Sequence, residues 1–164
     1  QEDYRPLIEL AKKKGIPVIA ANVPRRAAAA VAMTNKISPD VLGADRIYLS
    51  GTLYLDSKEY QKRFASALEE MPQGAPMKGK KVDGLYKAQV LKDAVMAGSL
   101  ELYLDRRILF CCGHFHSDYH LGIPYQLQKN HPKLKIAVIA MASSVENLLM
   151  RDRSSVADFI WVEE

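Results

Sequence analysis

Three of the four histidines of this 164-residue chain lie in one short segment, residues 114–120. They are His114, His116 and His120, and Asp118 stands among them. Imidazole nitrogens and carboxylate oxygens are common protein ligands of transition metals, and histidine also transfers protons near neutral pH. The spacing therefore predicts a functional loop that binds a metal or a metal-containing cofactor. The alternative is a polar surface loop without a ligand.

One known zinc motif is close to this spacing. His114, His116 and Asp118 resemble the start of the H-x-H-x-D-H pattern of metallo-β-lactamases, in which neutral imidazoles bind zinc. The next histidine of this chain falls one residue late, at His120, and the remaining one is the distant His131. The zinc pattern is incomplete, and we do not favour it.

The elements that must position this loop can be predicted from apolar runs. Four short runs are typical of buried strands and lie near residues 17–21, 107–112, 134–141 and 158–162. Stretches with helical spacing separate them, and strands that alternate with helices favour a parallel sheet covered on both faces. We therefore predict an α/β fold, a mostly parallel sheet flanked by helices, in one domain over residues 1–164.

The predicted helices cover residues 3–15, 22–36, 56–71, 83–104 and part of 117–130. Gly15 ends the first helix, and Asp56 or Ser57 caps the third. Because the third and fourth helices follow one another without a strand, we predict a small helical insertion over approximately residues 50–104. A parallel α/β fold more usually begins with a strand, so we also expect that an N-terminal strand is missing from this sequence.

Composition excludes some classes of function. The net charge of +4 comes from scattered basic residues without a basic stripe interleaved with aromatics, so we expect no nucleic-acid partner, whereas a small anionic ligand is compatible. No segment approaches the roughly 20 apolar residues of a membrane helix, so we expect no transmembrane segment. The two cysteines, Cys111 and Cys112, are adjacent rather than spaced as C-x-x-C, which favours free thiols.

Polar residues follow the predicted strands at the edge where ligands usually bind. Residues 22–26 follow the first strand, 113–120 the second and 142–144 the third. In open parallel sheets, ligands bind beyond the carboxyl ends of the strands. This topology brings Asn22 and Arg25 toward the histidine segment.

One face of the long helix predicted over residues 83–104 carries side chains that could line a binding site. Tyr86, Gln89, Asp93 and Met96 share one face by their spacing, while the aliphatic residues lie largely on another. This pattern has two interpretations, a solvated polar stripe or the lining of a cavity, and the spacing leaves both open.

Three blocks in order resemble the conserved blocks of the ChaN-like haem-binding uptake family, which is grouped with the Tiki and TraB proteins. The blocks are IPVIAANVPRR, YKAQVLKDAVMA and CCGHFHSDYHLGIPYQL, and the resemblance extends from about Pro6 to about Ile139. The matching positions are Asn22, Pro24 and Arg25 in the first block, Ala88, Gln89, Asp93, Met96 and Ala97 in the second, and Gly113, His116, Tyr119, His120, Gly122 and Pro124 in the third.

The resemblance implies haem or iron binding by a parallel α/β body with a helical insertion, and it favours the cavity interpretation of the long helix. In the family a tyrosine of the helical part can coordinate iron, and two haems can stack between subunits, which implies a homodimer or a larger assembly. Tyr86 is the best helical candidate here, while His116 and His120 also suit iron. Arg25 or Arg26 could pair with a haem propionate. The implied ligand site comprises Asn22, Arg25, Tyr86, Gln89, Asp93, His116 and His120.

Two other functions stay open. Tiki-like relatives are regarded as metal-dependent hydrolases, which would make His116, with His120, a ligand of a divalent metal that activates water. The G-E-x-H-type motif with which family members normally begin is not in this sequence. The third possibility is a scaffold or assembly subunit that kept the fold without the site. Family members occur in bacterial envelopes and in plastids, so the localisation stays unknown.

Overall fold

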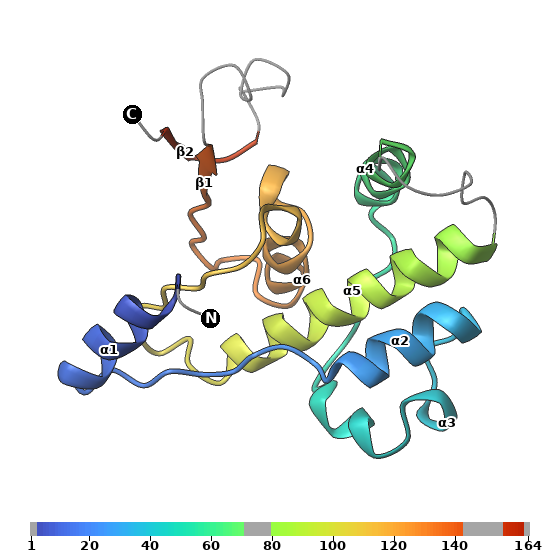
Figure 1. Cartoon of the computed structure of the whole chain (residues 1–164), viewed down its shortest axis with the longest axis horizontal. Coiled ribbons are helices and arrows are strands. Elements are labelled where there is room, and N and C mark those ends of the chain that lie inside the picture. Colours follow the sequence, from blue (N-terminus) through green and yellow to red (C-terminus); the bar gives the residue numbers. More distant parts are fainter. Residues whose placement is uncertain (1–2, 71–79, 143–155, 163–164) are drawn as a thin grey trace.

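The structure is a computed structural model that describes residues 3–70, 80–142 and 156–162 (Figure 1). The helices within these ranges are α1 (Arg5–Lys13), α2 (Arg25–Thr34), α3 (Pro39–Leu42), α4 (Lys58–Glu69), α5 (Lys80–Glu101) and α6 (Ile123–Asn130). The short 3-10 helices are η1 (Gly43–Tyr48), η2 (His114–His116) and η3 (Asp118–His120). The strands are β1 (Ile139–Ala142) and β2 (Phe159–Val162).

The long helix α5 runs through the centre of the molecule and contacts α2, α4 and α6 (Figure 1). Leu91 and Val95 pack against the alanine-rich side of α2, whereas Met96 packs against α6. Val90 packs against aromatic side chains that include Tyr60 of α4. A helix that is buried on nearly all sides must be apolar around most of its circumference, and α5 satisfies this requirement.

Small residues allow α2 and α5 to approach closely. Gly84 of α5 is buried, and a Cβ atom at this position would lie 2.3 Å from the carbonyl oxygen of Ala32 in α2. Ala27 and Val31 of α2 face the same interface and are almost completely buried. The two helices can therefore approach this closely only because glycine at position 84 has no Cβ atom.

The prediction of helices from periodicity is confirmed, with bounds that differ by a few residues. Ser57 caps α4, because its hydroxyl oxygen accepts a hydrogen bond from the Tyr60 amide at 3.3 Å. Asp56, the other predicted cap, binds Lys129 instead. Met71, the last residue predicted for this helix, lies outside the described residues.

The prediction of four strands is wrong in part. The runs near 17–21 and 107–112 are not strands, and they expose apolar side chains such as Val18 and Leu109. The run at 134–141 forms a strand only from Ile139, and 158–162 corresponds to β2. β1 and β2 pair in parallel, Ile139 opposite Phe159. The described residues thus combine helices with a two-stranded parallel sheet rather than a larger sheet, because an apolar run becomes a strand only where another strand lies beside it.

Other predictions stay open. The structure has α4 and α5 within residues 50–104, but their status as an insertion stays a prediction, and so does a missing N-terminal strand. Among the described residues, no helix is long and apolar enough to cross a membrane.

The close approach at Gly84 gives a first testable prediction. In an ordinary helix, Gly→Ala stabilises by up to about 1 kcal/mol because alanine has the higher helix propensity. Here we expect Gly84→Ala to lower the free energy of unfolding by about 1–3 kcal/mol, because the new methyl group meets the Ala32 backbone. Urea unfolding followed by circular dichroism measures the change.

Gly113→Ala is the matched control. Gly113 has a φ of −66°, and the nearest atom to a new Cβ would be 3.9 Å away, so we expect little change in stability. A stabilised Gly84→Ala variant would show that α2 and α5 are not in close contact.

Candidate functional site

A buried carboxylate in the middle of α5 organises the candidate site. Asp93 is fully buried, and its Oδ1 lies 2.5 Å from Nδ1 of His116. Its Oδ2 accepts a hydrogen bond of 2.7 Å from the hydroxyl of Tyr60. Each carboxylate oxygen therefore has a donor, as a buried acidic group requires.

This geometry assigns the tautomer of His116. When Asp93 is ionised its oxygens can only accept hydrogen bonds, and the proton of the imidazole is then on Nδ1 and points at Asp93. Nε2 then carries a lone pair, and no hydrogen bond or ion pair of this atom is found among the described residues. The His116 side chain is 18% exposed. A histidine held by a carboxylate with its other nitrogen uncommitted is a typical metal ligand or general base.

Gln89 completes the network. Its Nε2 lies 3.1 Å from Nδ1 of His116 and 3.1 Å from the hydroxyl oxygen of Tyr60. Because the proton on Nδ1 is directed at Asp93, the amide donates to Tyr60, which in turn donates to Asp93. The four side chains form one connected set of hydrogen bonds, which we call the Asp93 network.

Burial determines the protonation of the groups around this site. It raises the pKa of Asp93, while the hydrogen bond and charge of His116 act in the opposite direction. Burial also raises the pKa of Tyr60 far above its usual range, and the nearby charge of Asp93 is the second cause of this increase. The same two causes raise the pKa of Tyr86 to about 12. Both phenols therefore stay protonated at neutral pH.

The loop that carries His116 has a tightly constrained backbone. Gly122 has a φ of 62°, and a Cβ atom there would lie 2.5 Å from the carbonyl oxygen of His116. Tyr119 and His120 also adopt positive φ angles of 61° and 56°, which is uncommon for residues other than glycine. The guanidinium of Arg63 in α4 stacks on the Tyr119 ring at 3.5 Å. These contacts determine where the loop presents His116.

The three histidines of this loop bind three different carboxylates. His116 pairs with Asp93 of α5, His114 with Asp118 in its own loop, at 3.3 Å, and His120 with Asp158 beside β2, at 3.1 Å. Within residues 3–70, 80–142 and 156–162, no group of three His, Cys, Asp or Glu side chains could hold a metal ion. The described part of the chain therefore offers three separately paired imidazoles rather than a multidentate metal site, and of the three only His116 is paired with a fully buried carboxylate.

Comparison with known families identifies the chain. The sequence model of the family described as "Haem-binding uptake, Tiki superfamily, ChaN" matches residues 1–127. The chain belongs to this family. Comparison with curated proteins and with solved structures found no match.

The structure brings together the second and third of the ChaN-like blocks. Gln89 and Asp93 of the second block meet His116 of the third in the Asp93 network. The solvated interpretation of the long helix is wrong, because Tyr86, Gln89 and Asp93 are all buried. Tyr86 lies beside Tyr60 and donates to the carbonyl oxygen of Ser57 at 3.3 Å, so its ring packs against the network.

The first block lies against another face of α5. Val23 packs on Leu91 and Val95, and Asn22 accepts a hydrogen bond from the Val23 amide. Arg25 is exposed at the start of α2. No hydrogen bond or ion pair of the described residues joins Asn22, Arg25 or His120 to the Asp93 network, and their role in ligand binding stays a prediction.

Sequence reasoning missed Tyr60 and the aromatic cluster around it. The Tyr60 ring stacks on Phe115 at 5.4 Å between centroids and meets Tyr86 edge to face at 5.9 Å. Phe64 contacts both Phe115 and Tyr86. The local sequence contains no signal for these contacts, since Tyr60 and Asp93 lie 33 residues apart.

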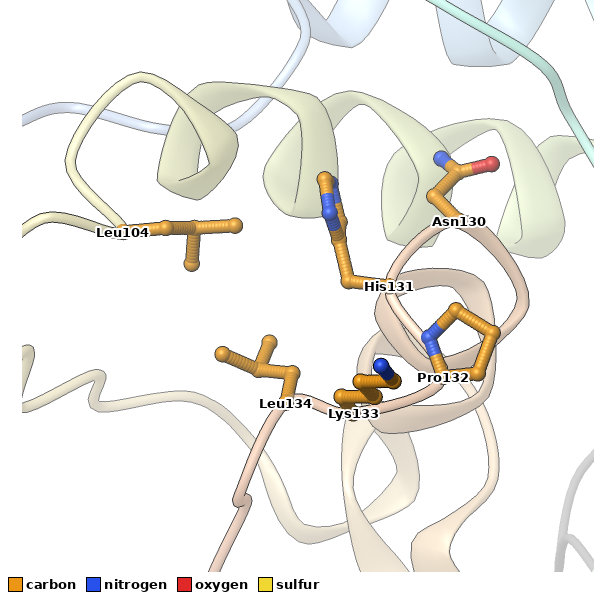
Figure 2. Close-up of a pocket in the computed structure, with 6 residues that line it drawn as sticks. All are labelled: Leu104, Asn130, His131, Pro132, Lys133 and Leu134. Atoms are coloured by element: carbon orange, nitrogen blue, oxygen red, sulfur yellow. The ribbon is translucent and has the colours of Figure 1, made fainter.

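One pocket shares Tyr60 with the Asp93 network, and a second pocket shares no residue with it. One, of about 420 Å³, has Tyr60 and Phe115 in its wall together with charged residues of α4. The other, of about 480 Å³, lies at the ends of α5 and α6, and Figure 2 shows Leu104, Leu134 and His131 around it. His131 also contacts Glu101 at 3.3 Å. Neither of these two pockets is lined by His116 or Asp93, so the interpretation of the α5 face as the lining of a cavity stays a prediction.

The Tyr60 hydroxyl gives the second testable prediction. We expect Tyr60→Phe to lower the free energy of unfolding by about 1–3 kcal/mol, because one oxygen of the buried Asp93 loses its donor. Tyr48→Phe is the control, since Tyr48 is exposed and its hydroxyl makes no hydrogen bond among the described residues. Urea unfolding compares the two variants, and equal stabilities would contradict the assigned hydrogen bond.

Proposed function

We propose that this chain binds haem and that Nε2 of His116 coordinates the iron. The observation that carries the proposal is the hydrogen bond between Asp93 and His116, which directs a lone pair away from the buried carboxylate. The proximal histidine of many haem proteins is oriented through its second nitrogen in a comparable way. The family match supports a haem-related ligand for the same chain.

The number of available ligands favours haem over a bare metal ion. A catalytic zinc ion needs about three protein ligands, whereas a porphyrin supplies four nitrogens to its iron and needs one or two from the protein. The described residues contain no three-ligand group, but they do contain His116, an imidazole oriented by a fully buried carboxylate. The donor set that is present fits a haem iron.

The state of the tyrosines favours His116 over Tyr86 as the ligand. A tyrosine binds ferric iron as phenolate, but burial and the nearby charge of Asp93 raise the pKa of Tyr86 to about 12. Its hydroxyl is also occupied by a hydrogen bond to Ser57. Coordination by Tyr86 would require that this buried proton be lost, whereas the hydrogen bond from Nδ1 of His116 to Asp93 leaves a lone pair on Nε2.

The other residues of the site would act through His116 or on the haem periphery. Asp93 and Tyr60 would hold the imidazole orientation and make Nε2 a stronger electron donor. Arg26 makes a two-pronged ion pair with Asp45, with distances of 2.6 and 2.8 Å. Arg25 is exposed and has no ion pair among the described residues, so we propose Arg25 as the partner of a propionate.

A haem titration followed by absorbance tests the proposal. We expect a saturable Soret shift in the unaltered chain and a loss of affinity of at least about tenfold in His116→Ala. His114→Ala is the matched control, because His114 belongs to the same loop but binds Asp118. Tyr86→Phe should also keep the shift.

The titration separates the alternatives. A Soret shift that disappears in Tyr86→Phe and persists in His116→Ala would show that Tyr86, rather than His116, coordinates the iron. No shift, together with stoichiometric zinc or manganese in the isolated protein, would favour the metal-dependent hydrolase. If neither haem nor metal binds, the scaffold interpretation holds.

The role of Asp93 gives a separate prediction. Asp93→Asn keeps the shape of the side chain but removes the charge that holds the proton on Nδ1 of His116. We expect haem affinity to fall by about 10–100-fold while the Soret position stays that of a histidine complex. Asp83→Asn in the first turn of α5 is the control. An unchanged affinity in Asp93→Asn would show that the carboxylate has no role in iron binding.

A further inference from the structure

Two consecutive residues after His116 have backbone angles that residues with side chains disfavour. Tyr119 and His120 have φ angles of 61° and 56°, in the left-handed region. Residues other than glycine are strained in this region, and such strain persists only where surrounding contacts hold the chain. The turn at residues 119–120 must therefore be held by contacts with other parts of the molecule.

The segment that leads into β2 contacts each residue of this turn. The Tyr119 amide donates a hydrogen bond of 2.7 Å to the carbonyl oxygen of Val156, a residue with no exposed surface. Nε2 of His120 lies 3.1 Å from Oδ2 of Asp158. If the turn relaxed to ordinary angles, the chain would change direction and both contacts would be lost. The strained turn is therefore attached to residues 156–158.

The carboxylate of Asp158 is itself fixed by the chain just before β1. Oδ2 accepts a hydrogen bond of 2.7 Å from the Val138 amide. In return, the amides of Asp158 and Phe159 donate to the carbonyl oxygen of Val138, at 3.0 and 3.1 Å. The strand pair lies at an edge of the molecule, outside the helices that surround α5 (Figure 1). Asp158 thus connects the turn to this strand pair.

The form of the turn determines the position of the His116 backbone. The His120 amide donates a hydrogen bond of 3.1 Å to the carbonyl oxygen of Ser117, the residue after His116. Gly122 approaches the carbonyl oxygen of His116 so closely that a Cβ atom there would lie 2.5 Å from it. A change in the turn therefore moves the backbone of His116, whose Nδ1 lies on Asp93.

We propose that Asp158 is a positioning residue of the candidate site. Through its contact with His120 it holds the strained turn, and the turn keeps His116 on Asp93. The inference rests on the proposed haem function only for its consequence, which is that release of the strand pair lowers haem affinity. The side chains of His120 and Asp158 are 41% and 40% exposed, so the expected effect is moderate, about three- to fivefold.

The first measurement uses the protein without haem, so its result does not depend on the haem proposal. The Nδ1 proton of His116, hydrogen bonded to Asp93, should give a downfield proton NMR signal that exchanges slowly with solvent. We expect Asp158→Ala and His120→Ala each to speed this exchange at least about threefold. An unchanged His116 signal in Asp158→Ala overturns the positioning role.

Asp105→Asn is the matched control for Asp158→Ala. Asp105 is an exposed carboxylate that pairs with its neighbour Arg106, so this variant should leave the His116 signal unchanged. Circular dichroism measures the helix content of every variant. Loss of helix content in Asp158→Ala assigns Asp158 to the stability of the whole fold and also overturns the positioning role.

Glycine at position 120 tests whether strain is the reason that Asp158 is needed. Glycine adopts a φ of 56° without strain, so a turn with glycine does not require the contact with Asp158. We expect His120→Gly to keep the His116 signal, although His120→Ala, which also lacks the imidazole, loses it. We also expect His120→Gly to restore the signal when it is added to Asp158→Ala. Equal loss in His120→Gly and His120→Ala overturns the proposal.

Haem titration of the same variants tests the consequence for binding. We expect haem affinity to fall about three- to fivefold in Asp158→Ala and to stay within about twofold of the unaltered chain in His120→Gly. Unchanged affinity in Asp158→Ala overturns the regulation of the site by the strand pair. If the His116 signal responds as expected but the unaltered chain binds no haem, the haem proposal fails and the positioning role of Asp158 is confirmed.

Discussion

The burial of one carboxylate constrains the centre of this molecule. An ionised carboxylate inside a protein costs several kcal/mol unless donors surround it, so Asp93 can be fully buried only if donors reach both of its oxygens. The donors come from two other parts of the chain, Tyr60 on α4 and His116 on the loop before α6. The positions of α4 and of this loop relative to α5 are therefore linked through one buried group. The same link gives His116 its orientation.

The central helix combines packing and chemistry on different sides. Leu91 and Val95 pack against α2, and Met96 packs against α6. Gln89 and Asp93, on another side of the helix, belong to the Asp93 network. A helix that must serve all of these contacts has little surface left for solvent, which explains why its polar residues are buried and mutually hydrogen bonded. Stability of the core and orientation of the ligand side chain thus depend on the same element.

The sheet contrasts with this well-packed centre. Its two strands pair in parallel, but the side chains of one face, including Met141 and Trp161, are left in solvent, as is the apolar side of α1. Such surfaces cost free energy in water and favour association.

Sequence by itself determined the helices and the core of the site, and tertiary structure decided the rest. Helical periodicity and caps such as Ser57 are local properties, and Gln89, Asp93 and His116 stood out by spacing and by block resemblance. Strand pairing is not local, so equal apolar runs became a strand at Ile139–Ala142 and unpaired chain at 107–112. Only the folded chain could show that Tyr60 reaches Asp93, or that His120, four residues from His116, binds a different carboxylate. Local spacing limits which side chains share a helix face, but contacts between distant segments depend on how those segments pack.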